Sequence, residues 1–427
     1  MLLVLLDSAG PRQRYIVRHL LERMLGWPVR FAADLEAYRT HNGPKLHYGE
    51  PLVDDDGHVV VPAIELEALK PGMALPPPTL CDGLPVLHGD DPFADSFTLL
   101  SLMDELGNVE RDAHGRIPSS ALHVVRHQVS ELALVDRWAL RLADRLRARY
   151  PDLPAPVRNF RHVLTVDVDN GFRYLGRPLL RQAGAFIRDL LRLRPSDAWE
   201  RVEVLLGRKR DPFDRYNELA ALATTASLHR VIAFLLMRGG AANDHAVPHE
   251  TRFHQRVHAI RGAVEIGLHP SYHSSELPSI TTAERDDLQA ITGEMIQLSR
   301  QHFLRWRLPD TLRGLAAAGF TEDHSLGFSD RVGFRAGTCT PFPYYDLERD
   351  EETGLMLWPF VCMDSALHDR MGVGADGALA HIRPLIDEVR GVGGTFVSTW
   401  HDRFLSDRGP WKGWWQVMQR TIEAARP

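Results

Sequence analysis

The stretch from residue 163 to residue 172, with the sequence VLTVDVDNGF, constrains the fold more than any other part of the chain. Its apolar residues predict a strand buried on both faces, and Asn170 and Gly171 predict the turn that ends it. Asp167 and Asp169 then lie at the carboxyl end of a strand, with both side chains on the same side. In parallel α/β folds, ligand-binding and catalytic residues commonly lie at this end of the strands. A plain turn is the alternative, since Asp is common after strands.

Strands and helices are expected to alternate after this stretch. Apolar runs predict strands at residues 227–236, 264–268, 303–308 and 395–400. Helices are predicted at 178–193, 198–206 and 310–318. Because strands alternating with helices indicate parallel sheets, we expect residues 158–427 to form a parallel (β/α) barrel or a close relative.

Residues 1–157 are predicted to form a smaller α/β domain of their own. A chain of 427 residues is too long for one ordinary compact core, so two domains are expected. Strands are predicted at 2–6 and 59–61, and helices at 12–25, 93–106 and 124–147. The segment 150–156 contains three prolines and is the predicted linker. The role of this first domain is left open.

The composition argues against several classes of protein. No apolar run approaches the roughly 20 residues that a membrane-spanning helix requires. A net charge of −6 with interspersed signs gives no basic stripe, so nucleic-acid binding is not expected. The cysteines Cys81, Cys339 and Cys362 form no closely spaced pair, which fits a reducing compartment. The first residues suit a strand better than a signal peptide, and a cytoplasmic location is predicted. The oligomeric state is left open.

Two histidines follow the strand predicted at 264–268. His269 and His273 are four residues apart, so a helical turn starting there would place both imidazoles on one face at metal-ligand spacing. The same spacing occurs in two further pairs, His245 with His249 and His254 with His258. Because those pairs follow no predicted strand, we interpret them as surface histidines.

One carboxylate and two imidazoles can hold a divalent ion and leave positions open to water and substrate. We predict that Asp169, His269 and His273 bind one divalent metal ion, with zinc as the first choice and cobalt, nickel or manganese as alternatives. Asp167 would stay free as a general base for water.

A further histidine is a candidate general acid. His401 directly follows the strand predicted at 395–400 and could protonate a leaving group, with Asp364 or Asp402 as its orienting partner. A purely structural histidine is the alternative.

Five motifs in this order carry a family resemblance: Thr165 to Asp169, Gly267 to His273, Arg305 to Pro309, Phe334 to Gly337, and Trp400 with His401. The order resembles the polysaccharide deacetylases, carbohydrate esterase family 4, also called the NodB-homology family. Within this family the chain is similar to a bacterial branch with an extra N-terminal α/β domain. The resemblance covers residues 158–427 motif by motif, and residues 1–157 only loosely, through Asp112 to Arg116.

The resemblance implies a distorted (β/α) barrel deacetylase domain preceded by a smaller α/β domain. It implies that Asp167 is the base, that Asp169 and the two histidines hold the metal, and that His401 is the acid. The arginine that orients the base falls on Arg305 or Arg307. The chain departs from the family pattern in two ways: Val168 separates the usually adjacent acids, and the arginine motif offers two candidates.

Arg335 and Tyr272 are the candidate substrate-binding residues. Arg335 lies in a compact loop and could reach a substrate oxygen; an ion pair that fixes the loop is an equal alternative. Tyr272 lies between the two histidines of the predicted metal site.

Three hypotheses for function follow. The first is a metal-dependent hydrolase that removes N-acetyl groups from an amino sugar of a glycan, glycolipid or activated precursor. The second keeps the metal site but cleaves another amide or an O-acetyl ester. The third is a non-catalytic carbohydrate-binding or assembly protein, which the complete set of acids and histidines argues against.

Overall fold

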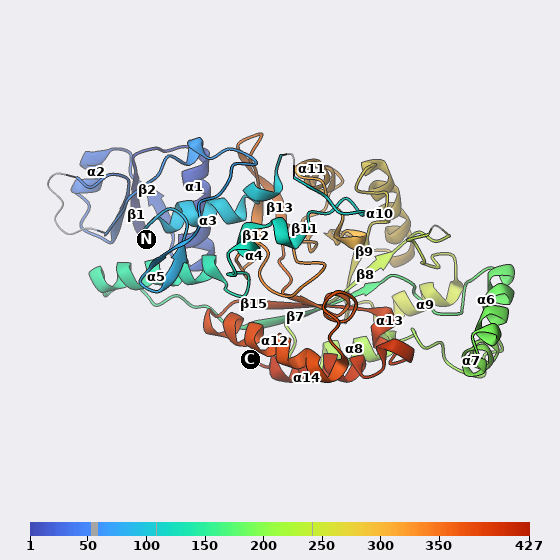
Figure 1. Ribbon diagram of the computed structural model, residues 1–427. Helices are drawn as coiled ribbons and strands as arrows, with labels where there is room; N and C mark the ends of the chain where they lie inside the picture. Colours follow the sequence, from blue (N-terminus) through green and yellow to red (C-terminus); the bar gives the residue numbers. More distant parts are fainter. Residues whose placement is uncertain (53–58, 108, 241) are drawn as a thin grey trace.

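Two sheets, one parallel and one mostly parallel, organise the chain, as the computed structural model in Figure 1 shows. The structure describes all residues except 53–58, 108 and 241. A four-stranded sheet has the strand order β2-β1-β3-β4 and lies near the N-terminus. A nine-stranded sheet has the order β12-β13-β11-β10-β9-β8-β7-β15-β14. Strands β5 and β6 form a separate hairpin.

The elements of the first part are β1 (Leu2–Leu6), α1 (Pro11–Arg18), the π-helix η1 (His19–Met24), β2 (Val29–Phe31), α2 (Leu35–Arg39), β3 (Lys45–Tyr48), β4 (Val59–Val61), η2 (Leu66–Ala68), β5 (Thr79–Cys81), β6 (Leu84–Val86), α3 (Pro92–Leu100), η3 (Met103–Glu105), η4 (Ser119–Ala121), α4 (His123–Arg126) and α5 (Leu134–Arg149).

The elements of the second part are β7 (Arg161–Val168), α6 (Leu179–Leu191), α7 (Pro195–Leu205), α8 (Tyr216–Thr225), β8 (Arg230–Leu236), α9 (Thr251–Ile260), β9 (Glu265–His269), α10 (Pro278–Thr292), β10 (Leu298–Ser299), η5 (His302–Leu304), α11 (Asp310–Ala317), β11 (Glu322–Asp323), β12 (Phe342–Asp346), β13 (Glu351–Leu357), β14 (Cys362–Met363), the π-helix η6 (Ala366–Arg370), α12 (Ala375–Gly391), β15 (Thr395–His401), α13 (Asp402–Leu405), η7 (Gly409–Trp411) and α14 (Trp414–Ala424).

The larger sheet makes the protein a mixed α/β fold. Its neighbouring strands pair in parallel except for β12 and β13, which are antiparallel. The order ends at β12 and β14, and no pairing between these two strands is present among the described residues, so barrel closure stays a prediction. Helices α12 and α14 pack on each other below β7 and β15 in the view of Figure 1. None of the described helices combines the length and apolar character needed to cross a bilayer.

The central strand β7 has the burial that its sequence predicts. Every residue from His162 to Val168 is buried, and only the first residue, Arg161, is exposed. Asp167 lies opposite His401 of β15, and Val168 lies opposite Leu235 of β8. Strand β8 in turn places Leu236 opposite His269 of β9. Because these strands are parallel and in register, their carboxyl ends bring the predicted functional side chains to one edge of the sheet.

The turn after β7 requires glycine. Gly171 has a φ of +70°, and a Cβ atom there would lie 3.0 Å from the ring of Phe253. The backbone N–H groups of Asn170 and Gly171 donate to Asp402 Oδ2 at 2.9 and 3.0 Å. This carboxylate therefore fixes the path of the chain directly beyond Asp169.

Two predicted elements are corrected by the structure. The strand predicted at 303–308 is wrong, because Phe303 and Leu304 have φ values of 60° and 54° in a short turn; the strand is β10, which precedes them. The helix predicted at 124–147 is two helices, α4 and α5, with Gln128 at a φ of 58° between them.

Buried polar contacts join residues 1–157 to the rest of the chain. Glu105 receives two hydrogen bonds from the guanidinium of Arg335, at 2.7 and 2.6 Å, and both residues are buried. The fully buried Asp136 accepts hydrogen bonds from Thr338 and from the backbone N–H of Cys339. These contacts hold residues 1–157 closely against the second part of the chain. That residues 1–157 form a separate domain therefore stays a prediction.

We predict that Glu105→Ala lowers the free energy of unfolding by about 3–5 kcal/mol, because it leaves the buried Arg335 charge without its partner. The control is Asp387→Ala, which removes the exposed ion pair with Arg390 at 3.2 Å and should cost less than about 1 kcal/mol. Chemical denaturation of both variants measures the difference. Equal, small losses would contradict the role given to the buried pair.

Candidate functional site

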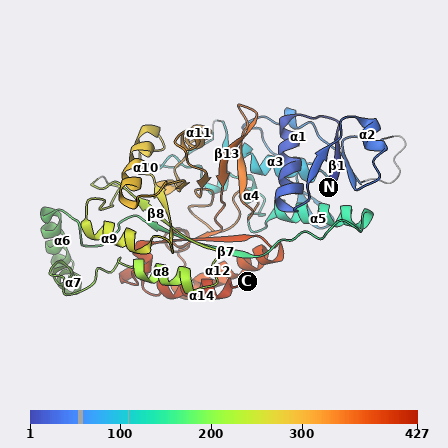
Figure 2. The same ribbon diagram turned by 180° about the vertical axis from the view of Figure 1, so that it is seen from behind.

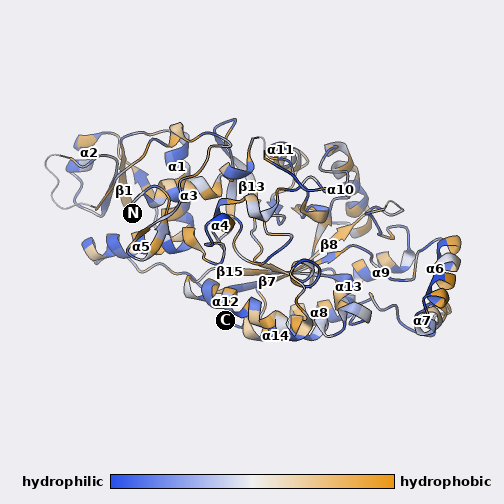
Figure 3. Cartoon of the chain, in the orientation of Figure 1, coloured by the Kyte–Doolittle hydropathy of each residue, from blue (hydrophilic) through white to orange (hydrophobic). Residues whose placement is uncertain are grey.

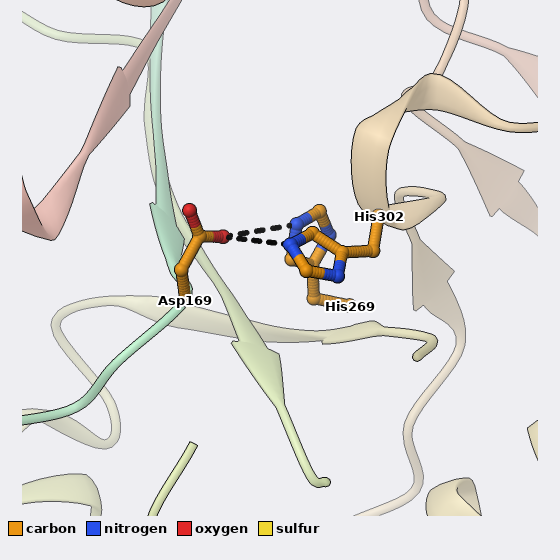
Figure 4. Close-up of side chains that lie close together, drawn as sticks. All are labelled: Asp169, His269 and His302. Atoms are coloured by element: carbon orange, nitrogen blue, oxygen red, sulfur yellow. Dashed lines mark ion pairs between the residues drawn. The ribbon is translucent and has the colours of Figure 1, made fainter. Parts of the chain in front are cut away.

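Three buried side chains form a candidate metal site at the edge of the sheet. Asp169 follows β7, His269 ends β9, and His302 lies in η5. Their ligand atoms all lie within 4.8 Å of one another. The Nε2 atoms of His269 and His302 lie 3.3 and 3.6 Å from Asp169 Oδ1, and Figure 4 shows both imidazoles facing this oxygen.

The surroundings of the three ligands suit a cation. Asp169 Oδ1 is buried and accepts no hydrogen bond from the described residues, whereas Oδ2 accepts one from Arg403 at 2.6 Å. Burial raises the pKa of Asp169, but three nearby histidines and Arg403 outweigh this effect and hold the pKa well below its usual range. Burial lowers the pKa of His302, which favours its neutral imidazole. Burial also lowers the pKa of His269, but the neighbouring Asp167 and Asp169 outweigh this effect and raise it. The donor set thus offers an ionised carboxylate and two imidazole nitrogens, which fits a divalent metal ion.

Each imidazole is oriented through its second nitrogen. His269 Nδ1 donates to the backbone carbonyl of Arg300 at 2.6 Å. His302 Nδ1 lies 3.2 Å from a carboxylate oxygen of Asp244. Partners of this kind fix the tautomer so that Nε2 faces the ion.

Asp167, the predicted base, lies beside the three candidate metal ligands, and one of its carboxylate oxygens accepts a hydrogen bond from Arg300. The Arg300 guanidinium donates from Nη1 to Asp167 Oδ1 at 2.9 Å and to Thr165 Oγ1 at 2.7 Å. Its Nε donates to the carbonyl of His324 at 2.9 Å, and its side chain is fully buried. The sequence predicted Arg305 or Arg307 for the contact with the base, and the structure places Arg300 there instead.

His401 lies on the other side of Asp167. Its Nδ1 lies 2.6 Å from Asp364 Oδ1, and its Nε2 lies 3.9 Å from Asp167 Oδ2. Burial lowers the pKa of His401, but Asp364 and other acids more than offset this, and the pKa is raised. Of the two orienting partners considered, the structure brings Asp364 to His401, whereas Asp402 holds the turn after β7.

A cavity of 570 Å³ connects these groups. Asp167, Asp169, both buried histidines of the metal group and His401 all line it. Its cationic walls come from distant parts of the chain: Arg116, Arg370 and Arg403. His245, one of the histidines interpreted as surface residues, is half-buried and also lines this cavity. The volume is in the range of small-molecule sites.

The structure places His273 away from the metal group. Its side chain is 62% exposed, and its Nδ1 lies 3.7 Å from Glu276. The reason is that β9 continues through His269 in an extended conformation ahead of Pro270, so the helical spacing of four residues does not apply. His302 occupies the third position instead.

The other predicted site residues lie outside the cavity wall. Arg305 pairs with Glu276 at 2.6 Å and covers the ring of Tyr272 at 3.8 Å, and Arg307 is exposed. The hydroxyl of Tyr272 lies 2.9 Å from Nδ1 of His114. Arg335 forms the buried pair with Glu105, which is the alternative role considered for it.

Two functional positions were not found from the sequence. His302 and Arg300 belong to the segment SRQH at 299–302, directly after β10. A strand of two residues has no periodicity to detect, so these polar side chains gave no signal of lying at a strand end.

A family model matches the first part of the chain. A model described as a family of unknown function, DUF7033, matches residues 2–151. No curated protein matches the chain.

Three solved structures show distant similarity. A Mycobacterium smegmatis protein named as a polysaccharide deacetylase has 16% identity and a TM-score of 0.41, covering 63% of this chain and 86% of its own. A Pseudomonas aeruginosa protein named as a polysaccharide deacetylase has 12% identity and a TM-score of 0.37, covering 62% and 83%. A 4-alpha-glucanotransferase from Thermococcus litoralis has 11% identity and a TM-score of 0.37, covering 62% and 37%. At this low level of similarity, the activities named for those proteins are not transferred to this chain.

We predict that His302→Ala weakens zinc binding by more than about 100-fold, since changing even outer partners of a metal ligand costs about 10–100-fold. His273→Ala is the matched control and should keep the affinity of the unchanged protein. Isothermal titration and metal content after dialysis measure both. If His273→Ala loses zinc and His302→Ala retains it, His273 and not His302 would be the third metal ligand.

Proposed function

We propose that the protein is a metal-dependent hydrolase that removes an N-acetyl group from an amino sugar of a glycan, glycolipid or activated precursor. The observation that carries this proposal is one cavity lined by three possible metal ligands, a separate carboxylate and a carboxylate-paired histidine. These are the groups that hydrolysis of an unactivated amide requires: an electrophilic centre, a base and an acid.

Asp169, His269 and His302 would hold the ion, consistent with the orphaned Asp169 Oδ1 between the two imidazoles. A divalent ion bound there supplies Lewis acidity toward the acyl oxygen and makes water more acidic. The ordered motifs at residues 165–169, 267–273 and 400–401, which resemble the polysaccharide deacetylases, favour an N-acetyl sugar as the substrate.

Asp167 is placed to accept the proton of the attacking water. Its Oδ1 is occupied by Arg300, so Oδ2 is the oxygen that remains, and it faces His401 Nε2. The hydrogen bond from the Arg300 guanidinium holds the Asp167 carboxylate in one orientation before the reaction.

His401 is placed to protonate the departing amine. Asp364 accepts a hydrogen bond from Nδ1–H, which leaves Nε2 directed into the cavity. Water oxygen bonds to the acetyl carbon, the C–N bond breaks, and the nitrogen takes the proton from His401. Acetate and a free amine are the products.

We predict that Asp167→Asn keeps its zinc and loses about 10²–10⁴-fold in turnover, because the base is removed while the three ligands remain. Acetate release from N-acetylated and O-acetylated sugars measures the rate and separates the amide from the ester hypothesis. Asp376→Asn, an exposed position in α12, is the control that should leave the rate unchanged. An Asp167→Asn protein of full activity would rule out this mechanism.

The pH dependence should respond to Asp364. Asp364 raises the pKa of His401, so the protonated acid persists to a higher pH than it would with a neutral neighbour. Activity is lost as the pH rises through the pKa of His401. Asp364→Asn should therefore shift the alkaline limb of the kcat/KM profile to lower pH. A profile that falls at the same pH in both proteins would remove His401 as the acid.

A further inference from the structure

The helical hairpin made of α6 and α7 has its polar and apolar sides reversed. The buried residues of α6 are Gln182 and Asp189, whereas helices of globular proteins bury their apolar stripe. Arg201 of α7 donates to both of these side chains, at 2.8 and 2.7 Å, so the inside of the hairpin is held by polar contacts. The apolar side chains of α6 consequently face outward.

The outward side of this hairpin holds most of the exposed large apolar side chains. Nine of the fifteen that the described residues contain lie between 179 and 206. Leu180, Ile187 and Leu191 are 89%, 57% and 79% exposed and follow one side of α6. Trp199 of α7 is also exposed. Scattered single exposed leucines are ordinary, but a contiguous set at helical spacing marks an interaction surface.

The hairpin stands at the edge of the molecule. Helices α6 and α7 pack on each other, and Figures 1 and 2 show them projecting beyond the sheet at the end opposite to α2. The colouring of Figure 3 shows hydrophobic residues along α6 at this outer end.

Positive charge is concentrated in the segment that forms the hairpin. Residues 177–210 contain nine arginines or lysines and four acids, a net charge of +5 in a protein of −6. Within the part of the chain that the structure describes, no side chain pairs with the guanidinium groups of Arg181, Arg192 or Arg194. Seven arginines, these three among them, line a cavity of 470 Å³ between the hairpin and the body, against two aspartates.

We propose that the α6–α7 hairpin docks the protein on the surface of an anionic phospholipid bilayer. Exposed leucines beside arginines are the composition of helices that lie in the membrane interface, where the apolar side enters the acyl boundary and the guanidinium groups contact headgroup phosphates. A second copy of the chain fits this surface less well, since pairing two hairpins of charge +5 would bring like charges together. The inference is independent of the proposed hydrolase activity.

The first test is sedimentation of the full chain with vesicles. We expect binding to vesicles of equal parts phosphatidylcholine and phosphatidylglycerol, weaker binding to phosphatidylcholine alone, and a decrease with added salt. No binding to the anionic vesicles, or equal binding to both vesicle types, would overturn the proposal.

Two sets of variants test the surface itself. Replacing Leu180, Ile187 and Leu191 together by Ser should weaken vesicle binding on the order of 100-fold, because three apolar side chains no longer enter the interface. Replacing Arg181, Arg192 and Arg194 together by Gln should also weaken it on the order of 100-fold. All six side chains are exposed, so folding should be unchanged, which circular dichroism checks.

Matched controls exist on the rest of the surface. Leu80, Val157 and Met295 are 75%, 85% and 77% exposed, and their triple Ser variant should bind as the unchanged protein does. Arg39, Arg383 and Arg420 are exposed arginines for the Gln control. Hairpin variants that bind like these controls would overturn the proposal. A dimer of the unchanged protein would also overturn it, if sedimentation velocity shows that the hairpin Ser variant is a monomer and the unchanged protein does not bind vesicles.

Discussion

A single buried positive charge, that of Arg300, connects the two halves of the candidate site. Its side chain holds Asp167 and Thr165 of β7, and its backbone carbonyl accepts the Nδ1 proton of His269. Taking a guanidinium out of water costs several kcal/mol, which the Asp167 charge and the further hydrogen bonds offset. The ring of Phe234 lies 4.6 Å below the same guanidinium. One residue thus contacts both the proposed base and one of the proposed metal ligands.

Residues 1–157 contribute to the cavity wall and pack against the β12–β13 edge of the larger sheet. Arg116 reaches the cavity wall, where its Nε donates to Asp112 at 2.8 Å. The carbonyl of the neighbouring His114 accepts a hydrogen bond from Arg305 at 2.7 Å. The loosely matching motif at 112–116 therefore belongs to the site through its position, although it supplies none of the groups assigned to catalysis. The buried Glu105–Arg335 pair holds this part against the second half.

The sequence predicted those features that depend on local pattern. The buried strand β7, the strands β8, β9 and β15, and the acids at the end of β7 follow from apolar runs and from the turn at Gly171. It did not predict His302 or Arg300, because the two-residue strand β10 leaves no periodicity and because left-handed residues at 303–304 turn an apolar run away from the sheet. His273 was chosen by helical spacing, but the chain is extended through His269 and turns only from Tyr272 onward. The third candidate metal ligand is set by contacts between segments that are distant in the sequence. Local spacing of residues carries no information about such contacts.

The two cavities of the second half adjoin each other. Asn170 and His245 line both the cavity of the candidate active site and the arginine-rich cavity beneath the hairpin. Arg177 reinforces the junction by donating from Nη1 to the carbonyl of His245 and from Nη2 to that of Phe172. If the hairpin lies on a bilayer, the cavity that adjoins the candidate active site lies directly beneath the membrane-bound hairpin. Among the three substrate forms considered, this neighbourhood favours the glycolipid, whose sugar is carried at a membrane surface.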